Sequence, residues 1–422
     1  MAELIEVKAV EERVILIAVG VGDGSDVAAS LTELEELVDT AGGVAVDKMI
    51  QNRENIHPGT YLGKGKIDEV KERIWELNAT GVVCDDELSP AQLRNLENAL
   101  DTKVMDRTMV ILDIFAARAN TSEGKIQVEL AQLKYRAARL VGLRNSLSRL
   151  GGGIGTRGPG EKKLEMDRRL IHERIGQLKS ELEEVKRHRE VQRKQRERTH
   201  TPVAAIVGYT NAGKSTLLNR LTGAGILAED KLFATLDPTT RILELDSGRR
   251  ILLTDTVGFI RKLPHHLVEA FKSTLEEAKY SDIILHVADS SNSQMDIQMH
   301  VVYETLRELG VSGKTIVTVF NKIDQAEGEQ LPRDLHSDYQ VRISARTGQG
   351  VDTLLETLEM ILRNQNIYLE RLFPYPEAGK IQQIRKYGEL LEEEYREDGI
   401  AVKAYVPAEL FVTLQGEGAG QI

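Results

Sequence analysis

The pattern of apolar and polar residues over roughly the first quarter of the chain predicts short β-strands separated by α-helices. Runs of consecutive apolar residues, typical of strands buried on both faces, alternate with stretches in which apolar residues recur every three or four positions. We expect strands at 14–19, 43–46, 82–84 and 110–115, and helices at 30–40, 65–77 and 89–100. Because strands that alternate with helices form parallel sheets, residues 1–115 are predicted to be an α/β domain.

A helical period begins near Ile126, where two apolar stripes follow one another. The first stripe ends near Leu147, and the second extends from Leu164 to Val185. Neither stripe can be buried alone, so we expect two antiparallel helices that face each other. With a polar helical linker, this hairpin is assigned to residues 116–200.

Positive charge gathers in the hairpin, although the whole chain has a net charge of −11. Residues 134–198 contain 19 Lys or Arg and 9 Asp or Glu. A basic segment on an acidic body is typical of proteins with a phosphate-rich partner, whereas the alternative is a solvated helix face. Six of the ten residues 151–160 are glycine, and glycine lets a backbone approach RNA closely. The alternative is that this loop is a disordered tip without a partner. The predicted RNA-binding residues are Arg144, Arg149, Arg157, Lys162 and Lys163.

A phosphate-binding loop with the pattern G-x-x-x-x-G-K-S follows the apolar run 203–207. In such a loop the backbone N–H groups surround the phosphates, the lysine neutralises their charge, and the serine hydroxyl ligates Mg²⁺. The loop consists of Gly208, Tyr209, Thr210, Asn211, Ala212, Gly213, Lys214 and Ser215.

Three later motifs, each after an expected strand, indicate a guanine nucleotide. Asp255 can hold a Mg²⁺-bound water and the Gly258 N–H can face the γ-phosphate. Asp324 can accept hydrogen bonds from the guanine N1–H and 2-amino group, and the Ala345 N–H can reach the guanine O6. We therefore predict a GTPase domain over residues 201–363. The assigned residues are Asp255, Thr256, Val257, Gly258, Asn321, Lys322, Ile323, Asp324, Ser344, Ala345 and Arg346.

These motifs resemble those of translation-factor-class GTPases, and the wider chain resembles the HflX family of the Obg–HflX-like superfamily. That resemblance rests on the phosphate loop and on residues 151–161, 233–241 and 255–259. It implies a GTPase whose GTP form binds the large ribosomal subunit, with the hairpin against rRNA near the peptidyl-transferase region, and dissociates stalled or stressed ribosomes. It also favours Thr235 over Thr239 and Thr240 as the second Mg²⁺ ligand. The further nucleotide-binding residues are Phe233, Ala234, Thr235, Leu236 and Asp237.

Hydrolysis is expected to be slow in the isolated protein. Phe259 stands where many GTPases of this fold have a glutamine that orients the attacking water, and phenylalanine offers no donor or acceptor for that task. Lys214, Thr235 and Gly258 are the expected catalytic residues. A partner or a monovalent cation would supply the rest, because Asn211 matches the asparagine by which some related GTPases hold K⁺, although it is equally a turn residue.

Residues 364–422 are predicted to form a small α/β domain, and the sequence does not indicate its function. We expect a strand at 368–372, an acidic helix at 381–396 and an apolar stretch at 400–406. The single cysteine, Cys84, and the lack of a signal segment or a membrane-length apolar run favour a cytoplasmic monomer that associates with ribosomes. Two other functions stay open: a signalling switch that binds an acidic protein through the hairpin, and an RNA-remodelling, helicase-like factor whose N-terminal domain uses ATP.

Overall fold

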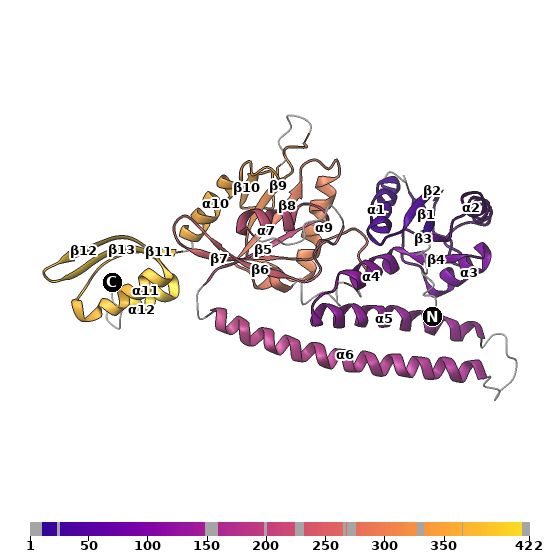
Figure 1. Cartoon of the computed structure of the whole chain (residues 1–422), viewed down its shortest axis with the longest axis horizontal. Helices are drawn as coiled ribbons and strands as arrows, with labels where there is room; N and C mark the ends of the chain where they lie inside the picture. The colour runs from indigo at the N-terminus through magenta and orange to yellow at the C-terminus, as the bar shows by residue number, and fades with distance from the viewer. Residues whose placement is uncertain are drawn as a thin grey trace, which may run out of the picture. The chain divides into compact units, whose positions relative to one another are not determined.

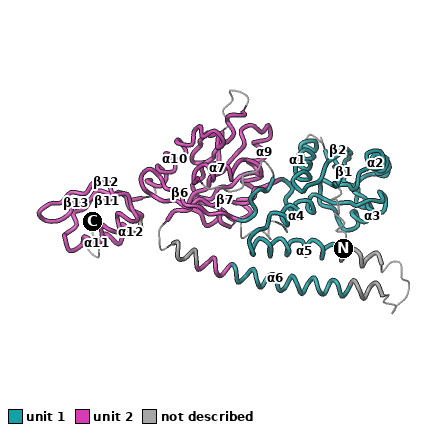
Figure 2. The backbone as a smooth tube through the Cα atoms, viewed as in Figure 1, with its two compact units in different colours: residues 1–185, 229–237, 261–272 teal, residues 186–228, 238–260, 273–422 magenta. Residues whose placement is uncertain are grey.

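The computed structural model describes residues 11–22, 26–147, 159–197, 201–223, 232–264, 267, 276–326, 333–364 and 366–415. The chain divides into two compact units, which Figure 2 shows in two colours. Unit 1 consists of Met1–Val185, Glu229–Asp237 and Arg261–Lys272, and unit 2 of Lys186–Ala228, Pro238–Ile260 and Ser273–Ile422. Two short segments that interrupt unit 2 in the sequence therefore belong to the N-terminal unit.

Unit 1 begins with a parallel sheet, as the sequence predicts. Its strands are β1 (Arg13–Val21), β2 (Val44–Arg53), β3 (Gly81–Cys84) and β4 (Lys103–Asp106). They lie in the order β2-β1-β3-β4, and every pairing between them is parallel. β1 and β3 are central strands and are almost entirely buried, which explains their unbroken apolar sequences.

Helices cover both faces of this sheet (Figure 1). They are α1 (Val27–Thr40), α2 (Lys64–Leu77), α3 (Pro90–Leu100) and α4 (Arg107–Arg118). On one face, Val70 of α2 and Leu96 of α3 pack with Ile15, Ile17 and Val82. α1 and α4 contact each other and the strands β1 and β4.

The strand expected at 110–115 is wrong, because these residues lie within α4. The fourth strand is β4, and it ends at Asp106, whose carboxylate accepts a hydrogen bond from the Met109 N–H and caps the helix. α4 is buried around most of its circumference, including Val110, Ile111 and Phe115. A continuous apolar run of this length does not by itself distinguish a buried helix from a strand.

Two long helices follow, α5 (Ser122–Leu147) and α6 (Pro159–Glu197), and they lie side by side in Figure 1. Leu130 and Ala137 of α5 pack with Ile175 and Leu178 of α6, as the two apolar stripes predict. At the edge of this contact Arg174 forms a bidentate ion pair with Glu129, with nitrogen–oxygen distances of 2.8 and 3.0 Å.

Unit 2 contains a second, larger sheet. Its strands are β5 (Val203–Gly208), β6 (Thr239–Glu244), β7 (Arg250–Asp255), β8 (Ile283–Asp289), β9 (Thr315–Asn321) and β10 (Tyr339–Arg342). They lie in the order β10-β9-β8-β5-β7-β6, and only β6 is antiparallel. Among the described residues of this part, the helices are α7 (Lys214–Thr222), α9 (Met295–Glu308) and α10 (Val351–Asn364). One apolar core joins β5, β7, β8 and β9 to α7 and α10.

The C-terminal part of unit 2 is a small antiparallel sheet with helices. The sheet has the order β11-β13-β12, with bounds Asn366–Phe373, Gly399–Pro407 and Glu389–Arg396, and the helices are α11 (Ala378–Tyr387) and α12 (Ala408–Gln415). The prediction of an acidic helix at 381–396 is therefore correct for its first part, which lies in α11, and wrong for its second part, which forms β12. Gly388 ends α11, and the acidic residues that follow form the edge strand β12, where charge blocks further strand pairing. Among the described residues, no helix is long and apolar enough to cross a membrane.

Candidate nucleotide-binding site

The phosphate loop lies between β5 and α7, at the carboxyl end of a central strand of the larger sheet. Its backbone takes left-handed conformations at Asn211 (φ 61°) and Gly213 (φ 92°). A Cβ atom at Gly213 would lie 2.3 Å from the Asn321 side-chain nitrogen, so only glycine fits there. This turn directs the N-terminal end of α7, with its backbone N–H groups, toward the place that phosphates occupy in such loops.

Lys214 begins α7 and is almost completely buried at 6% exposure. Its ammonium group donates a hydrogen bond to the Tyr209 carbonyl at 2.8 Å, which holds it over the loop. Burial lowers the pKa of Lys214 to about 8, and the nearby Asp255 carboxylate opposes that shift only in part. A buried cation with so little compensation is well suited to bind an anion.

Ser215 and Asp255 come together although 40 residues separate them. The Ser215 hydroxyl donates to the Asp255 carboxylate at 2.7 Å, because β5 and β7 are neighbours in the sheet and both end at this edge. A hydroxyl and a carboxylate are hard oxygen donors of the kind that Mg²⁺ takes in nucleotide sites. The donor set therefore fits a magnesium ion held directly by Ser215 and through water by Asp255.

Gly258 lies against the phosphate loop. A Cβ atom at this position would approach the Lys214 ammonium nitrogen to 3.0 Å and Thr210 to 2.8 Å. The next residue fixes this approach, since the Phe259 N–H donates to Gly208 at 3.1 Å and its carbonyl accepts from the Thr210 N–H at 2.8 Å. The Phe259 ring is 2% exposed, so its side chain is part of the core.

Asn321 joins the base-reading motif to the phosphate loop. Its side-chain amide donates to the Ala212 carbonyl at 2.8 Å, and its oxygen accepts from the Ala345 N–H at 2.9 Å. The residue is 2% exposed, so this clamp is shielded from water. The sequence predicts that the Ala345 N–H reaches the guanine O6, but in the structure this group donates to Asn321. The hydrogen bond places the 344–346 loop beside the base-reading motif.

Asp324 lies at the end of the same motif as an ionised acceptor. Its pKa is lowered chiefly by a hydrogen bond from the Ser344 side chain, with Arg346 nearby as a further cause. The Arg346 guanidinium pairs with the carboxylate at 2.6 Å and is itself largely exposed. An ionised carboxylate flanked by exposed space is the group that two donors on a guanine edge require.

Several other positions of the motifs have side chains that contact the rest of the protein. The Thr256 hydroxyl donates to the Ile206 carbonyl at 2.8 Å, Val257 and Tyr209 are buried, and Lys322 pairs with Asp289 at 2.8 Å. From these residues a nucleotide would meet mainly backbone atoms. Their side chains instead hold the loops in place.

The segment 233–237 is described in unit 1, and two of its side chains are engaged there. Phe233 is 2% exposed and its ring meets the edge of Phe115 at 4.7 Å between centroids. Asp237 accepts hydrogen bonds from the backbone of Asn120 and Thr121. Any contact of Phe233 or Asp237 with nucleotide would therefore come from the backbone.

The predicted RNA-binding residues lie at the margin of what the structure describes. Arg149 and Arg157 are outside the described residues. Arg144 belongs to α5, and Lys162 and Lys163 belong to α6, but only their backbone is described. Their role stays a prediction.

Three family models together match most of the chain. Residues 28–116 match the "GTP-binding GTPase N-terminal" model and residues 118–196 the "GTP-binding GTPase Middle Region" model. Residues 203–322 match the "50S ribosome-binding GTPase" model, and this match contains the phosphate loop, Asp255 and Asn321.

A curated relative named GTPase HflX from Lacrimispora saccharolytica is 78% identical over 414 residues, which is 98% of both chains. The chain belongs to the HflX family of GTPases. The HflX GTPase of Escherichia coli K12 is 42% identical over 379 residues, covering 89% of each chain. A crystal structure of a GTP-binding protein from Sulfolobus solfataricus in complex with GDP is 26% identical and matches with a TM-score of 0.44, over 82% of this chain and 97% of that one.

Membership in the HflX family confirms a GTP-binding GTPase, and the fold is the expected multidomain α/β architecture. Sequence reasoning found the motifs of the pocket because each is a contiguous string. It missed the residues that hold the segments after the phosphate loop: Asp85, Asp86, Asn120, Thr121 and Lys262. The only signal for the first two is a pair of acids directly after a buried strand, a position where parallel sheets bind ligands.

Proposed function

We propose that this HflX-family GTPase binds the large ribosomal subunit in its GTP form and dissociates stalled or stressed ribosomes. The observation that carries this proposal is a complete GTPase pocket in the same chain as a long, basic helical hairpin. The domain match that bears the description "50S ribosome-binding GTPase" supports it. In this proposal residues 1–115, 116–200, 201–363 and 364–422 act as four domains with separate tasks.

The pocket binds GTP through distinct groups. Lys214 and the N–H groups of the phosphate loop neutralise the phosphates, and Asp324 reads guanine, because adenine lacks the paired donors that an ionised carboxylate accepts. Mg²⁺, when bound, spreads the negative charge of the phosphates, and Ser215, Asp255 and Thr235 would hold it. Gly258 beside Lys214 leaves room for the γ-phosphate because it has no side chain.

Slow intrinsic hydrolysis follows from Phe259. Its ring is in the core, so the residue after Asp-x-x-Gly cannot orient water in this chain. We propose that the ribosome, or K⁺ held by Asn211, provides the missing positioning. Asn211 also has a structural role, since its backbone is left-handed and asparagine tolerates that conformation. Comparing hydrolysis rates in K⁺ and in Na⁺ distinguishes this role from K⁺ binding.

The hairpin supports an RNA partner through charge. On the described part of α6, Arg169, Lys179 and Arg187 are exposed on a helix whose apolar stripe is already covered by α5. Exposed cations on a rigid helix suit repeated phosphates along RNA. Tyr135, the one aromatic residue between 134 and 198, is buried and donates its hydroxyl to Asp106 at 2.6 Å, so it provides no platform for base stacking.

Co-sedimentation with purified ribosomal subunits tests this function. The protein is mixed with large or small subunits in the presence of a non-hydrolysable GTP analogue, GDP or no nucleotide. We expect pelleting with the large subunit, strongest with the GTP analogue, and we expect large subunits to accelerate GTP hydrolysis above the rate of the free protein.

The same assay distinguishes the other functions. No binding to either subunit in any nucleotide state would contradict the proposal and favour a switch with an acidic protein partner. Equal binding in all three nucleotide states would show that GTP does not control binding to the subunit. Lys214→Ala, which lacks the phosphate-binding cation, serves as the nucleotide-free control in each mixture.

A further inference from the structure

Thr210 lies in the phosphate loop, two residues after Gly208, at a position that the pattern G-x-x-x-x-G-K-S leaves open. The residue is buried, at 5% exposure, and among the described residues no group forms a hydrogen bond with its hydroxyl oxygen. A buried hydroxyl without a partner costs free energy, and native structures rarely contain one without a functional reason. A ligand group that enters the loop would provide the partner.

The surroundings of Thr210 are those assigned to the γ-phosphate. Its N–H donates to the Phe259 carbonyl at 2.8 Å, which fixes the residue against the motif that contains Gly258. Its methyl carbon and the Lys214 ammonium nitrogen lie 2.8 and 3.0 Å from the point that a Cβ atom of Gly258 would occupy. Because the hydroxyl and the methyl group are bonded to the same carbon, the hydroxyl also lies near Gly258 and Lys214.

The burial of Thr210 is compatible with a place in the phosphate site. Lys214, the cation assigned to the phosphates, is buried to nearly the same degree, at 6% exposure. Both side chains are covered because Gly258 lies directly against them. A γ-phosphate that enters between Gly258 and the loop therefore meets the ammonium group and the hydroxyl together.

We propose that Thr210 is a further catalytic residue of the GTPase, whose hydroxyl donates a hydrogen bond to an oxygen of the γ-phosphate. The inference rests on the assignment of the phosphate loop to GTP and does not need ribosome binding. A hydroxyl is a donor whose hydrogen rotates to suit the acceptor, and phosphate oxygens accept strongly.

The hydroxyl acts on the phosphoryl-transfer step. In this step the oxygen of water forms a bond to the γ-phosphorus, and the bond from that phosphorus to the β–γ bridging oxygen breaks. GDP leaves with the electron pair, and the proton that water loses passes to the released phosphate. Thr210 exchanges no proton and forms no covalent bond. It stabilises the negative charge that spreads over the γ-phosphate oxygens in the transition state.

This role differs from that of the glutamine that many GTPases have at the position of Phe259. Thr210 contacts the phosphate and does not orient the attacking water, so hydrolysis in the free protein stays slow. The bond exists only when a γ-phosphate is present. Thr210 therefore also favours binding of GTP over GDP.

The alternative is that Thr210 serves only to pack its methyl group against Gly258, to which the methyl carbon is close. Packing requires the methyl group, whereas catalysis requires the hydroxyl. Two substitutions distinguish these roles. Thr210→Val keeps the methyl group and the branched shape and removes the hydroxyl, and Thr210→Ser keeps the hydroxyl and removes the methyl group.

Each variant is measured as the full chain without ribosomes, by single-turnover hydrolysis of bound GTP and by calorimetry with a non-hydrolysable GTP analogue and with GDP. In Thr210→Val the hydrolysis rate and the ratio of GTP-analogue to GDP affinity should each fall by about tenfold, because one hydrogen bond to a charged group is lost. Thr210→Ser should stay within about threefold of the unaltered protein in both measurements, since it has the same donor. GDP affinity should stay within about twofold in both variants, because GDP has no γ-phosphate.

Thr305→Val is the matched control, because the Thr305 hydroxyl donates to the Val301 carbonyl of its own helix, α9, at 2.8 Å. It should change neither the rate nor the ratio. An unchanged hydrolysis rate in Thr210→Val, or equal losses in Thr210→Val and Thr210→Ser, overturns the proposal. If Thr210→Val does not fold, Thr210→Ala compared with Thr210→Ser decides by the same criterion. A wrong assignment of the loop itself would show differently, as tight GTP binding retained in Lys214→Ala.

Discussion

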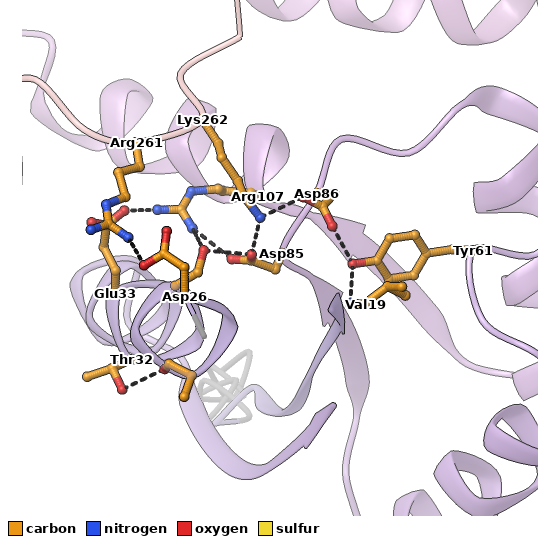
Figure 3. Close-up of polar contacts among 12 residues, drawn as sticks. Val19, Asp26, Thr32, Glu33, Tyr61, Asp85, Asp86, Arg107, Arg261 and Lys262 are labelled. Carbon is orange, nitrogen blue, oxygen red and sulfur yellow. Dashed lines mark hydrogen bonds and ion pairs between the residues drawn. The ribbon is translucent and has the colours of Figure 1, made fainter. Parts of the chain in front are cut away.

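The phosphate loop and the Asp85–Asp86 pair occupy the same kind of place in two different parallel sheets. Each follows a buried strand at its carboxyl end, where open α/β sheets bind ligands. The phosphate loop presents a cation and N–H groups to an anion that diffuses in, whereas the acidic pair presents carboxylates to Lys262 of the same chain (Figure 3). One type of sheet edge therefore serves an external ligand in one unit and an internal one in the other.

The contrast predicts different behaviour under mutation. Changes in the phosphate loop and the base-reading motif should weaken GTP binding directly. Changes at the acidic pair should leave the GTP pocket intact.

Lys214→Ala should weaken GTP binding by roughly a hundredfold or more, because it removes the buried charge over the loop, which the backbone N–H groups cannot replace. Titration with a fluorescent GTP analogue measures the loss. Lys403→Ala, on the C-terminal sheet, should bind normally. Retained tight binding in Lys214→Ala would mean that the loop does not hold the triphosphate as assigned.

Asp324→Asn should weaken GTP binding by about thirtyfold, since an amide offers the guanine edge a donor where an acceptor is needed. Binding of xanthosine triphosphate should improve, because its 2-oxo group accepts from the amide. Competition between the two nucleotides gives the readout. Asp338→Asn, which alters a carboxylate that accepts from the Ile316 N–H in the same domain, is the control, and identical preferences in both variants would show that Asp324 does not read the base.

Removing four hairpin charges should weaken large-subunit binding by about tenfold at moderate salt and reduce the slope of affinity against salt concentration. GTP affinity should stay unchanged. The altered residues are Arg149, Arg157, Lys162 and Lys163, each to alanine. The control removes four charges from the C-terminal domain: Lys380, Arg385, Arg396 and Lys403. Equal losses in both proteins would mean that net charge, and not the hairpin, sets the affinity.

The pocket should also respond to pH through Lys214. Burial lowers the pKa of this lysine to about 8 in the protein without nucleotide, and bound phosphate raises it again. Binding above that pH therefore requires proton uptake, so GTP affinity should fall by about threefold between roughly pH 7.5 and 8.5. Calorimetry in buffers of different ionisation enthalpy detects the proton, and a flat affinity over this range would contradict the assigned environment of Lys214.

The two regions also differ in how far the sequence reveals them. The phosphate loop is eight consecutive residues whose chemistry is local, so the pattern alone predicts it. The contact of the acidic pair depends on Lys262 meeting Asp85, 177 residues away in the sequence, and no periodicity indicates such a contact. The wrong prediction of a strand in place of α4 also reflects tertiary contacts. Phe115 of this helix packs against Phe233, a distant residue in the sequence, and such contacts make the helix apolar on several sides. The glutamates of the edge strand β12 are good helix formers, so the sequence predicts a helix there, but pairing with β13 outweighs that propensity.

Co-sedimentation with large subunits tests the central claim, that the nucleotide bound in the pocket controls the partner. The unaltered protein and Asp324→Asn are each mixed with large subunits and a non-hydrolysable analogue of GTP or of xanthosine triphosphate, at equal concentrations. Because the ionised Asp324 carboxylate reads the base, we predict that the unaltered protein pellets best with the GTP analogue and Asp324→Asn with the xanthosine analogue. The same preference in both proteins would contradict the account.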